Sequence, residues 1–274
     1  MTMKRLFALI LTLLMVLSLF AGCGGSGEQK EAEAPAPGVE TPDTPAEPEQ
    51  LDIIRVGVTA WPASMDPITK MGWTQNRILY QVFDTLLYCE DDATISSYIC
   101  DTWTRIDERT TEYKLKEGIT FHNGYPLTAE DVKFSLDRVL FDDSGYCDPN
   151  VTAVVNTIES VEVVDELTVR IVTSIPDPII FDRLASNLGV YIVCKQYIEE
   201  VGNEAFGVQP VGTGPFKVET VKLGEYTTLV KNADYFLTGT GNIEKIYMYP
   251  STDAGDTNLI TNAQAGNIDY AFCK

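Results

Sequence analysis

Apolar and polar residues alternate along this chain with two periods, one typical of helices and one typical of strands. In the segment 128–139 the apolar residues Val132, Leu136 and Val139 recur every three or four positions, which predicts an amphipathic helix with one buried stripe. Four charged residues of the segment fall outside this stripe and are expected in solvent: Glu130, Lys133, Asp137 and Arg138.

Thr128 and Asp131 mark the start of this helix. A threonine three residues before an acidic residue, directly before an apolar periodic run, has the spacing of a capping box. In that motif the hydroxyl satisfies a free backbone N–H of the first turn, and the carboxylate reaches back to the N-cap. We therefore expect the helix to begin at Thr128 or Ala129.

The rest of the chain after residue 50 alternates between the two periods. Helices are predicted over 75–87, with Ile78, Leu79, Val82 and Leu86 on one face, and over 178–188 and 256–265. Strands are predicted over 53–58, 160–164, 167–173, 216–220, 226–230, 243–249 and 268–272, with hairpin turns at 165–166 and 223–225. Strands that alternate with helices indicate an α/β fold, in which helices cover a sheet.

The first 22 residues have the pattern of an export signal. Lys4 and Arg5 precede an apolar run over 6–20, whose length suits the core of a signal peptide better than a membrane span. The run ends in LFAGC at 19–23, which is similar to the lipobox of bacterial lipoproteins. The similarity implies removal of residues 1–22 and a lipid on Cys23. A simple secretory signal with an incidental cysteine is the alternative.

Residues 23–50 consist mainly of Glu, Pro, Ala, Gly and Thr, with almost no large apolar side chain. Such a composition does not bury enough apolar surface to offset the entropy of ordering, so we expect an acidic, extended tether that leads to a folded body at 51–274. The formal net charge of −20 and the lack of a basic patch argue against binding to nucleic acid or to an anionic lipid surface.

A series of motifs points to a family. The run FHNGYPLTAEDVKFSLDRV at 121–139, with the strand before it at 113–119, resembles the signature of the bacterial extracellular solute-binding proteins of family 5. These are the peptide- and nickel-binding receptors of ABC importers. Further blocks resemble family segments in the same order: MDP at 65–67, VFDTLL at 82–87, VGTGPF at 211–216, NADYF at 232–236 and AGNID at 265–269.

The resemblance implies the type II periplasmic-binding-protein fold, in which two α/β lobes enclose the ligand. It places the first lobe at 51–68 and 158–274, with an inserted subdomain at 69–157. Family members are considerably longer than this sequence. We therefore expect the second lobe and the return strands of the first lobe to be absent, as in a partial record or a truncated gene product.

The resemblance also indicates where a ligand binds. In family members the loop between the Asp-Pro motif and the next helix faces the cleft, so Met71, Gly72, Trp73 and Thr74 are the candidate ligand contacts. Trp73 would contribute stacking or apolar enclosure, and the backbone would hydrogen-bond to a peptide main chain. Packing of Trp73 against its own helix is the alternative.

The expected function is that of a monomeric, lipid-anchored substrate-binding subunit on the extracytoplasmic face of the cell membrane. It would bind oligopeptides, dipeptides or another small solute and deliver them to ABC transporter permease subunits. Two alternatives stay open: a truncated, non-functional fragment of such a receptor, and an anchored extracellular α/β hydrolase.

The hydrolase alternative lacks catalytic groups. His122 is the single histidine, and no GxSxG elbow accompanies it, so we expect a hydrogen-bonded structural role and no enzyme activity. The glycines at 212–214 lack the lysine and helix of a phosphate-binding loop and are interpreted as a tight turn near the lobe hinge. No cofactor is expected.

The six cysteines leave disulfide pairing open. If Cys23 carries a lipid, an odd number of cysteines remains: Cys89, Cys100, Cys147, Cys194 and Cys273. Cys89 and Cys100 flank a short polar segment and are candidates for a bridge, with buried free thiols as the alternative. No CxxC or Cys/His spacing indicates a metal site, and none is expected.

Overall fold

The computed structural model describes residues 52–58, 62–69, 73–186, 190–222, 225–239, 241–250 and 256–272. These ranges belong to one compact unit, Glu47–Lys274. The expected signal segment, Cys23 and the tether lie outside the described residues. Within the described ranges, no helix is long and apolar enough to span a bilayer.

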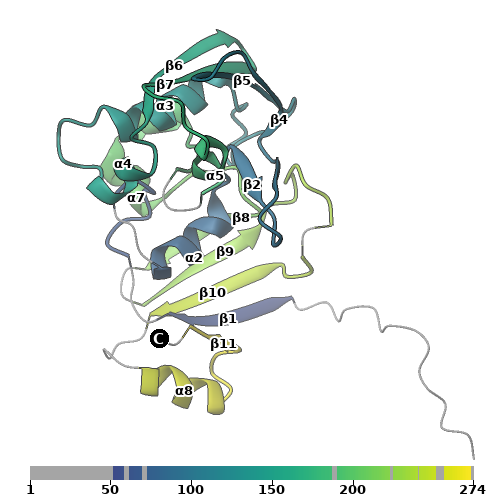
Figure 1. Ribbon diagram of the computed structural model, residues 1–274. Coiled ribbons are helices and arrows are strands. Elements are labelled where there is room, and N and C mark those ends of the chain that lie inside the picture. The colour runs from purple at the N-terminus through teal and green to yellow at the C-terminus, as the bar shows by residue number, and fades with distance from the viewer. Residues whose placement is uncertain are drawn as a thin grey trace, which may run out of the picture. The chain divides into compact units, whose positions relative to one another are not determined.

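A five-stranded sheet forms the base of this unit, in the strand order β11-β1-β10-β9-β8 (Figure 1). Its strands are β1 (Ile53–Val58), β8 (Phe216–Lys222), β9 (Tyr226–Lys231), β10 (Lys245–Pro250) and β11 (Tyr270–Ala271). β1 pairs in parallel with both β10 and β11, whereas β8, β9 and β10 pair antiparallel. The predicted strands and the hairpin between β8 and β9 are confirmed.

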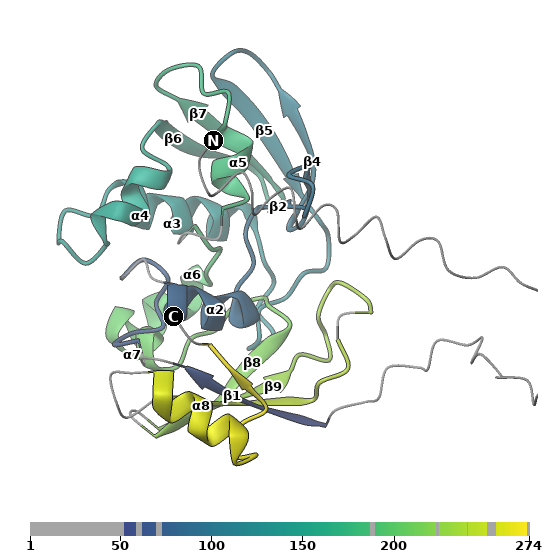
Figure 2. The ribbon, with the colours of Figure 1, turned by 60° about the horizontal axis from the view of Figure 1, so that its bottom comes forward.

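Helices lie on both faces of this sheet, with α2 (Trp73–Val82) on one face and α8 (Asp256–Gln264) on the other (Figure 2). The reason is the alternation along β1. Val56 and Val58 point to the α2 side, where they are buried in a cluster with Ile78. Gly57 points to the α8 side, so closely packed that a methyl group there would lie 2.7 Å from Leu259 Cδ2.

The helix predicted over 75–87 ends earlier than expected, at Val82. The carbonyl oxygen of Val82 accepts a hydrogen bond from the N–H of Gly214, at 2.9 Å. The glycine turn at 211–215 therefore occupies the place where the next turn of the helix would lie. Leu86 therefore does not belong to the face of this helix. It is buried in a separate cluster with Tyr113, and the chain continues into a strand at Leu87.

A second, four-stranded antiparallel sheet has the order β4-β5-β7-β6. Its strands are β4 (Cys100–Arg105), β5 (Thr110–Leu115), β6 (Ile158–Asp165) and β7 (Thr168–Thr173), and β2 (Leu87–Cys89) with β3 (Ile95–Ser97) forms a separate hairpin. The predicted hairpin at 165–166 is confirmed. Because β7 pairs with β5 on one side and with β6 on the other, this sheet extends across position 157, the expected end of the inserted subdomain.

Helix α3 (Ala129–Leu140) packs on the four-stranded sheet. Val132, Leu136 and Val139 are buried as predicted, and the capping box at Thr128 and Asp131 is formed. The expectation that Arg138 lies in solvent is wrong, because its side chain is only 9% exposed and pairs with a buried carboxylate. Shorter helices complete the fold: α4 (Pro149–Val154), α5 (Ile180–Leu184), α6 (Lys195–Val201) and α7 (Asn203–Val208).

The candidate bridge between Cys89 and Cys100 is not formed, and both are free thiols. In the β2–β3 hairpin Cys89 pairs with Ile95 and is exposed, whereas Cys100 begins the next strand and is fully buried. Cys147 and Cys194 are buried free thiols, and Cys273 lies outside the described residues.

Candidate functional site

Three neighbouring strands of the five-stranded sheet have their carboxyl ends on the same side of the sheet. β10, β1 and β11 run in the same direction, and the register pairs Val58 with Pro250 and Gly57 with Ala271. The helices that follow β1 and β10 lie on opposite faces of the sheet (Figure 2). Ligands of open α/β sheets bind outside the carboxyl ends of strands, at the point where the connections change face. We call this place the carboxyl edge, and it is the candidate site.

The sequence-predicted contacts lie on the segment that leads from β1 into α2. Met71 and Gly72 lie outside the described residues, and Trp73 and Thr74 are the first two residues of α2. On the next turn, the Arg77 guanidinium lies over the ring of Phe272, 4.0 Å from its centroid. Phe272 directly follows β11, so the N-terminal half of α2 lies next to the carboxyl edge.

A pocket of about 360 Å³ opens at this edge, on the α8 side of the sheet. Its lining consists of Gly57, Tyr249, Pro250, Asn258, Leu259, Asn262, Asn267 and Ile268. The amide of Asn262 donates to Asn258 Oδ1 at 2.6 Å, and that of Asn267 donates to Asn262 Oδ1 at 3.0 Å. We call it the asparagine pocket. It combines an aromatic ring with amide groups that can both donate and accept hydrogen bonds.

The sequence motifs do not predict these asparagines as site residues, although the sequence contains a signal for them. Asn258 and Asn262 are four residues apart within the predicted helix, and this spacing places them on the same helix face. What the sequence does not show is that α8 packs against Gly57, which places this helix face at the carboxyl edge.

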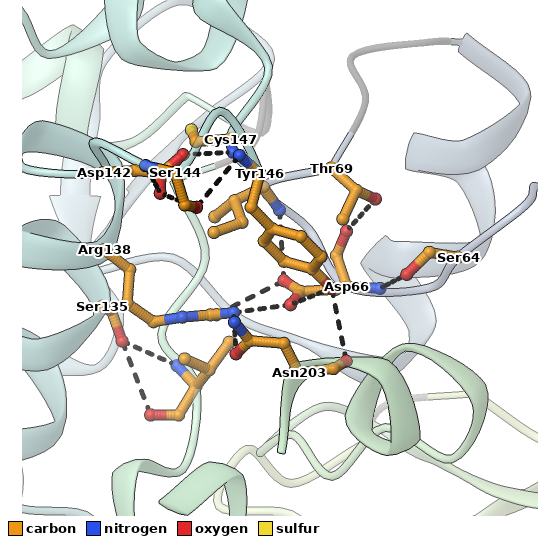
Figure 3. Close-up of polar contacts among 12 residues, drawn as sticks. Ser64, Asp66, Thr69, Ser135, Arg138, Asp142, Ser144, Tyr146, Cys147 and Asn203 are labelled. Carbon is orange, nitrogen blue, oxygen red and sulfur yellow. Dashed lines mark hydrogen bonds and ion pairs between the residues drawn. The ribbon is translucent and has the colours of Figure 1, made fainter.

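The chain between β1 and α2 is anchored by a buried ion pair (Figure 3). Arg138 Nη2 lies 2.6 Å from Asp66 Oδ2, and Nη1 lies 3.3 Å from Oδ1. The carboxylate is fully buried and the guanidinium is 9% exposed. A two-point contact of this kind fixes the orientation of both groups as well as their distance.

Further groups complete the surroundings of Asp66 (Figure 3). The Tyr146 hydroxyl donates to Asp66 Oδ2 at 3.3 Å, and the backbone N–H of Ile68 donates to Oδ1 at 3.3 Å. Burial and the nearby Asp66 carboxylate raise the pKa of Tyr146 to about 12. Asn203 Oδ1 accepts from Arg138 at 3.1 Å. This network positions residues 62–69, which lead into the predicted ligand loop, and its carboxylate has no free face for a ligand.

The glycine turn at 211–215 is fastened to the end of α2. Asp84, two residues after the end of α2, accepts hydrogen bonds from the hydroxyls of Thr213, Tyr98 and Tyr235 at 2.7, 2.7 and 3.0 Å. Burial raises the pKa of Asp84, and these three hydrogen bonds oppose that shift. The turn therefore has a structural role at the end of a helix, as expected from its lack of a phosphate-binding lysine.

His122 packs against the same turn. Its Nε2 lies 2.9 Å from the carbonyl oxygen of Gly214, and its Nδ1 accepts from the N–H of Gly212 at 3.3 Å. Desolvation lowers the pKa of His122 to about 4, so the ring is neutral at pH 7. The expected hydrogen-bonded structural role is confirmed.

Among the described residues, no group of three or more His, Cys, Asp or Glu side chains could hold a metal ion. Asp142 caps a local turn, in which its carboxylate accepts from the N–H groups of Ser144 and Cys147.

Comparison with known proteins identifies a family. The model of the bacterial extracellular solute-binding proteins, family 5 Middle, matches residues 94–272. Among curated proteins, the glutathione-binding protein GsiB of Salmonella typhi is 26% identical over 210 residues, which are 76% of this chain and 40% of that protein. The chain thus spans about 40% of the length of this curated relative.

Solved structures share the fold. The binding protein MoaA from A. tumefacien R10, in complex with mannopinic acid, has a TM-score of 0.71 and 26% identity, over 80% of this chain and 44% of its own. The periplasmic binding protein DppA from Helicobacter pylori, in complex with the peptide STSA, has a TM-score of 0.71 and 21% identity. That match covers 79% of this chain and 45% of DppA.

Proposed function

Because the chain belongs to the bacterial extracellular solute-binding proteins of family 5, we propose that it binds peptides or peptide-like solutes for uptake by an ABC importer. Members of this family bind solutes for transport and are not enzymes, which removes the hydrolase alternative. The observation that carries the proposal is the family match over 94–272, a range that includes β10, α8 and β11 of the carboxyl edge.

Peptides are the preferred solute class. Glutathione, the ligand in the name of GsiB, is a peptide, and the DppA structure holds the peptide STSA. The asparagine pocket supports the same class, because side-chain amides match the donors and acceptors of a peptide main chain. A second candidate is a solute such as mannopinic acid, the ligand of MoaA.

Met71, Gly72, Trp73 and Thr74 are the proposed ligand contacts. Their support is the position of the first turns of α2 beside the carboxyl edge, and the buried Asp66–Arg138 pair that anchors the segment before them. Enclosure of a ligand needs a second, movable face, so we propose a second lobe that closes over this edge. The division into a first lobe and an inserted subdomain is part of this proposal.

A location outside the cytoplasm follows from the same proposal. A lipid on Cys23 would hold the protein at the membrane surface, and residues 24–50 would serve as its tether. ABC transporter permease subunits are the proposed partners, and the protein would act as a monomer.

Isothermal titration calorimetry with the longest protein that the gene encodes tests the function. Glutathione, a tetrapeptide and mannopinic acid are titrated separately, and we expect saturable binding of at least one peptide. Replacing Trp73 with Ala should weaken that binding about tenfold, the loss expected for an aromatic contact. Ile106→Ala, at an exposed turn between β4 and β5, is the control.

The outcomes separate the hypotheses. Binding of mannopinic acid without any peptide would replace the peptide assignment and keep solute binding. Unchanged peptide affinity in Trp73→Ala would remove the proposed contact set. Absence of binding for every solute, in a folded protein, would overturn the function.

A further inference from the structure

A second pocket, of about 390 Å³, lies at the other end of α2 from the carboxyl edge. Its lining consists of Tyr80, Phe83, Asp84, Thr85, Tyr88, Cys89, Tyr98, Ala185 and Tyr191, and we call it the tyrosine pocket. Trp73 and Val82, the two ends of α2, are separated by about 14 Å along the helix axis. The tyrosine pocket is thus separate from the proposed peptide site.

Aromatic rings form its walls in two pairs. Tyr80 and Tyr191 meet edge to face, with 6.2 Å between ring centroids, and Tyr88 and Tyr98 meet at 5.2 Å. Phe83 lies 6.0 Å from Tyr191 and extends the first wall. The two pairs come from different parts of the fold, the first from α2 and residue 191, and the second from the region of the β2–β3 hairpin.

The depth of these rings differs. Tyr191 is 3% exposed and belongs to the interior, whereas Tyr80 and Tyr88 are 37% and 43% exposed and stand at the mouth. The mouth residues are therefore accessible to a ligand, and their replacement does not open the core.

The residues that line the pocket include an acidic side chain and no basic one. Asp84 is the one acidic residue among those that line it, and no lysine or arginine is among them. The turn after β2 adds three exposed acidic residues beside Tyr88: Glu90, Asp91 and Asp92. Aromatic faces carry a partial negative charge as well. The aromatic faces and the nearby acidic residues thus favour a cation over an anion.

We propose that the tyrosine pocket binds an alkylammonium headgroup. A cation enclosed by several aromatic rings is attracted by each ring face, and this attraction is strongest for a weakly hydrated ion such as quaternary ammonium. The pocket falls within the volume range of small-molecule sites. Asp84 supplies a carboxylate at its base, held in place by three hydroxyl donors.

Choline chloride is the probe, titrated into the whole protein by calorimetry. Its uncharged isostere, 3,3-dimethyl-1-butanol, has the same shape and is the chemical control. We expect saturable choline binding and at least about tenfold weaker binding of the isostere, since the cation–π attraction needs the charge. An isostere that binds as tightly as choline would show an ordinary apolar cavity and overturn the proposal.

Variants at the mouth locate the binding. Tyr88→Leu and Tyr80→Leu should each raise the choline dissociation constant about three- to tenfold. Tyr88→Phe should keep the dissociation constant of the parent protein, because the aromatic ring remains. Phe141→Leu, at an exposed aromatic residue after α3, should leave it unchanged. Equal affinity in both leucine variants and the parent protein would place choline elsewhere and overturn the proposal.

The proposal does not rest on the peptide function. Glutathione added in excess should leave the choline titration unchanged, because the two sites lie at opposite ends of α2. Competition between glutathione and choline would overturn the separate site, and a failure of glutathione to bind at all would leave it intact.

Discussion

Arg138 and Asp66 form a two-point ion pair between α3 and the chain that follows β1, with 2.6 Å between Nη2 and Oδ2. The two residues are 72 positions apart, and each is almost completely removed from solvent. The pair fixes the segment that leads into the proposed ligand loop. Its contribution is therefore measurable both as stability and as the position of that loop.

Replacing Arg138 with Met should destabilise the protein strongly. The Asp66 carboxylate would stay buried without its cation, which costs about 3 to 5 kcal/mol. Arg138→Lys should also lose stability, because an ammonium group does not reproduce the two-point contact. Urea unfolding at pH 7, followed by circular dichroism, measures both changes.

The matched control is an exposed ion pair. Arg55 and Asp269 lie 2.7 Å apart, but both side chains are 40% exposed. Arg55→Met should cost much less, because solvent already screens this exposed pair. If the two methionine variants lost equal stability, burial would not be the reason for the strength of the Asp66 contact.

The position of Arg138 also shows what the sequence could and could not predict. The stripe of α3 and its capping box follow from residues within one or two turns, so the pattern alone located this helix correctly. The same pattern placed Arg138 in solvent, because nothing local indicates a partner 72 residues away. A local sequence pattern therefore cannot predict an ion pair between residues that are far apart in the chain.

His122 should make the protein less stable in acid. Its pKa of about 4 in the folded state lies below the value of about 6.5 expected in the unfolded chain. Between these values the unfolded state binds more protons, so the free energy of unfolding falls as the pH decreases from about 6.5 to 4, by about 3 kcal/mol. Protonation at Nδ1 would also remove the acceptor for the Gly212 N–H.

The comparison of the protein with His122→Gln isolates this effect from the titration of the carboxyl groups. Urea unfolding at several pH values between 4 and 7 should show a shallower decline in the variant, which has no group to protonate at this place. Parallel pH profiles for the two proteins would contradict the role of His122.

The capping box should depend more on Asp131 than on Thr128. The Asp131 carboxylate accepts from the backbone N–H of Thr128 and of Lys195, both at 2.9 Å, and so links the starts of α3 and α6. Asp131→Ala leaves both donors without this acceptor and should cost about 2 to 3 kcal/mol. Thr128→Ala removes only the hydroxyl and should cost about 1 kcal/mol.

Thermal unfolding of both variants measures this difference. Glu130→Ala, an exposed neighbour on the first turn of the same helix, should change the stability by less than about 0.5 kcal/mol. An equal loss in Thr128→Ala and Asp131→Ala would mean that the link to Lys195 contributes nothing.

In the candidate site too, features that depend on one segment could be predicted, and features that depend on contacts between distant segments could not. The family motifs predict ligand contacts in the chain between β1 and α2, and the structure places the start of α2 beside the carboxyl edge. The asparagine pocket depends on the close approach of α8 to Gly57, which no single segment encodes. The early end of α2 depends likewise on a turn far along the chain, where the Gly214 N–H donates to Val82 O.

The glycine turn at 211–215 packs tightly against the end of α2. A Cβ atom on Gly214 would lie 2.5 Å from the backbone carbon of Val82 and 2.7 Å from its oxygen. Backbone atoms at the end of a helix have no easy way to move, so Gly214→Ala should destabilise the protein by about 3 kcal/mol or more. Gly145→Ala is the control, since its positive φ of 77° carries strain but no atom lies within 4 Å of the added methyl group.

The two alanine variants thus separate crowding from backbone strain. Gly145→Ala should cost only about 1 to 2 kcal/mol, the penalty of a left-handed conformation. Gly214→Ala should cost more and should also move Thr213 away from Asp84, which the loss of a protected Thr213 hydroxyl signal in NMR spectra would report. A Gly214→Ala protein as stable as the parent would show that the turn can withdraw from Val82, and that the end of α2 is fixed by something other than this contact.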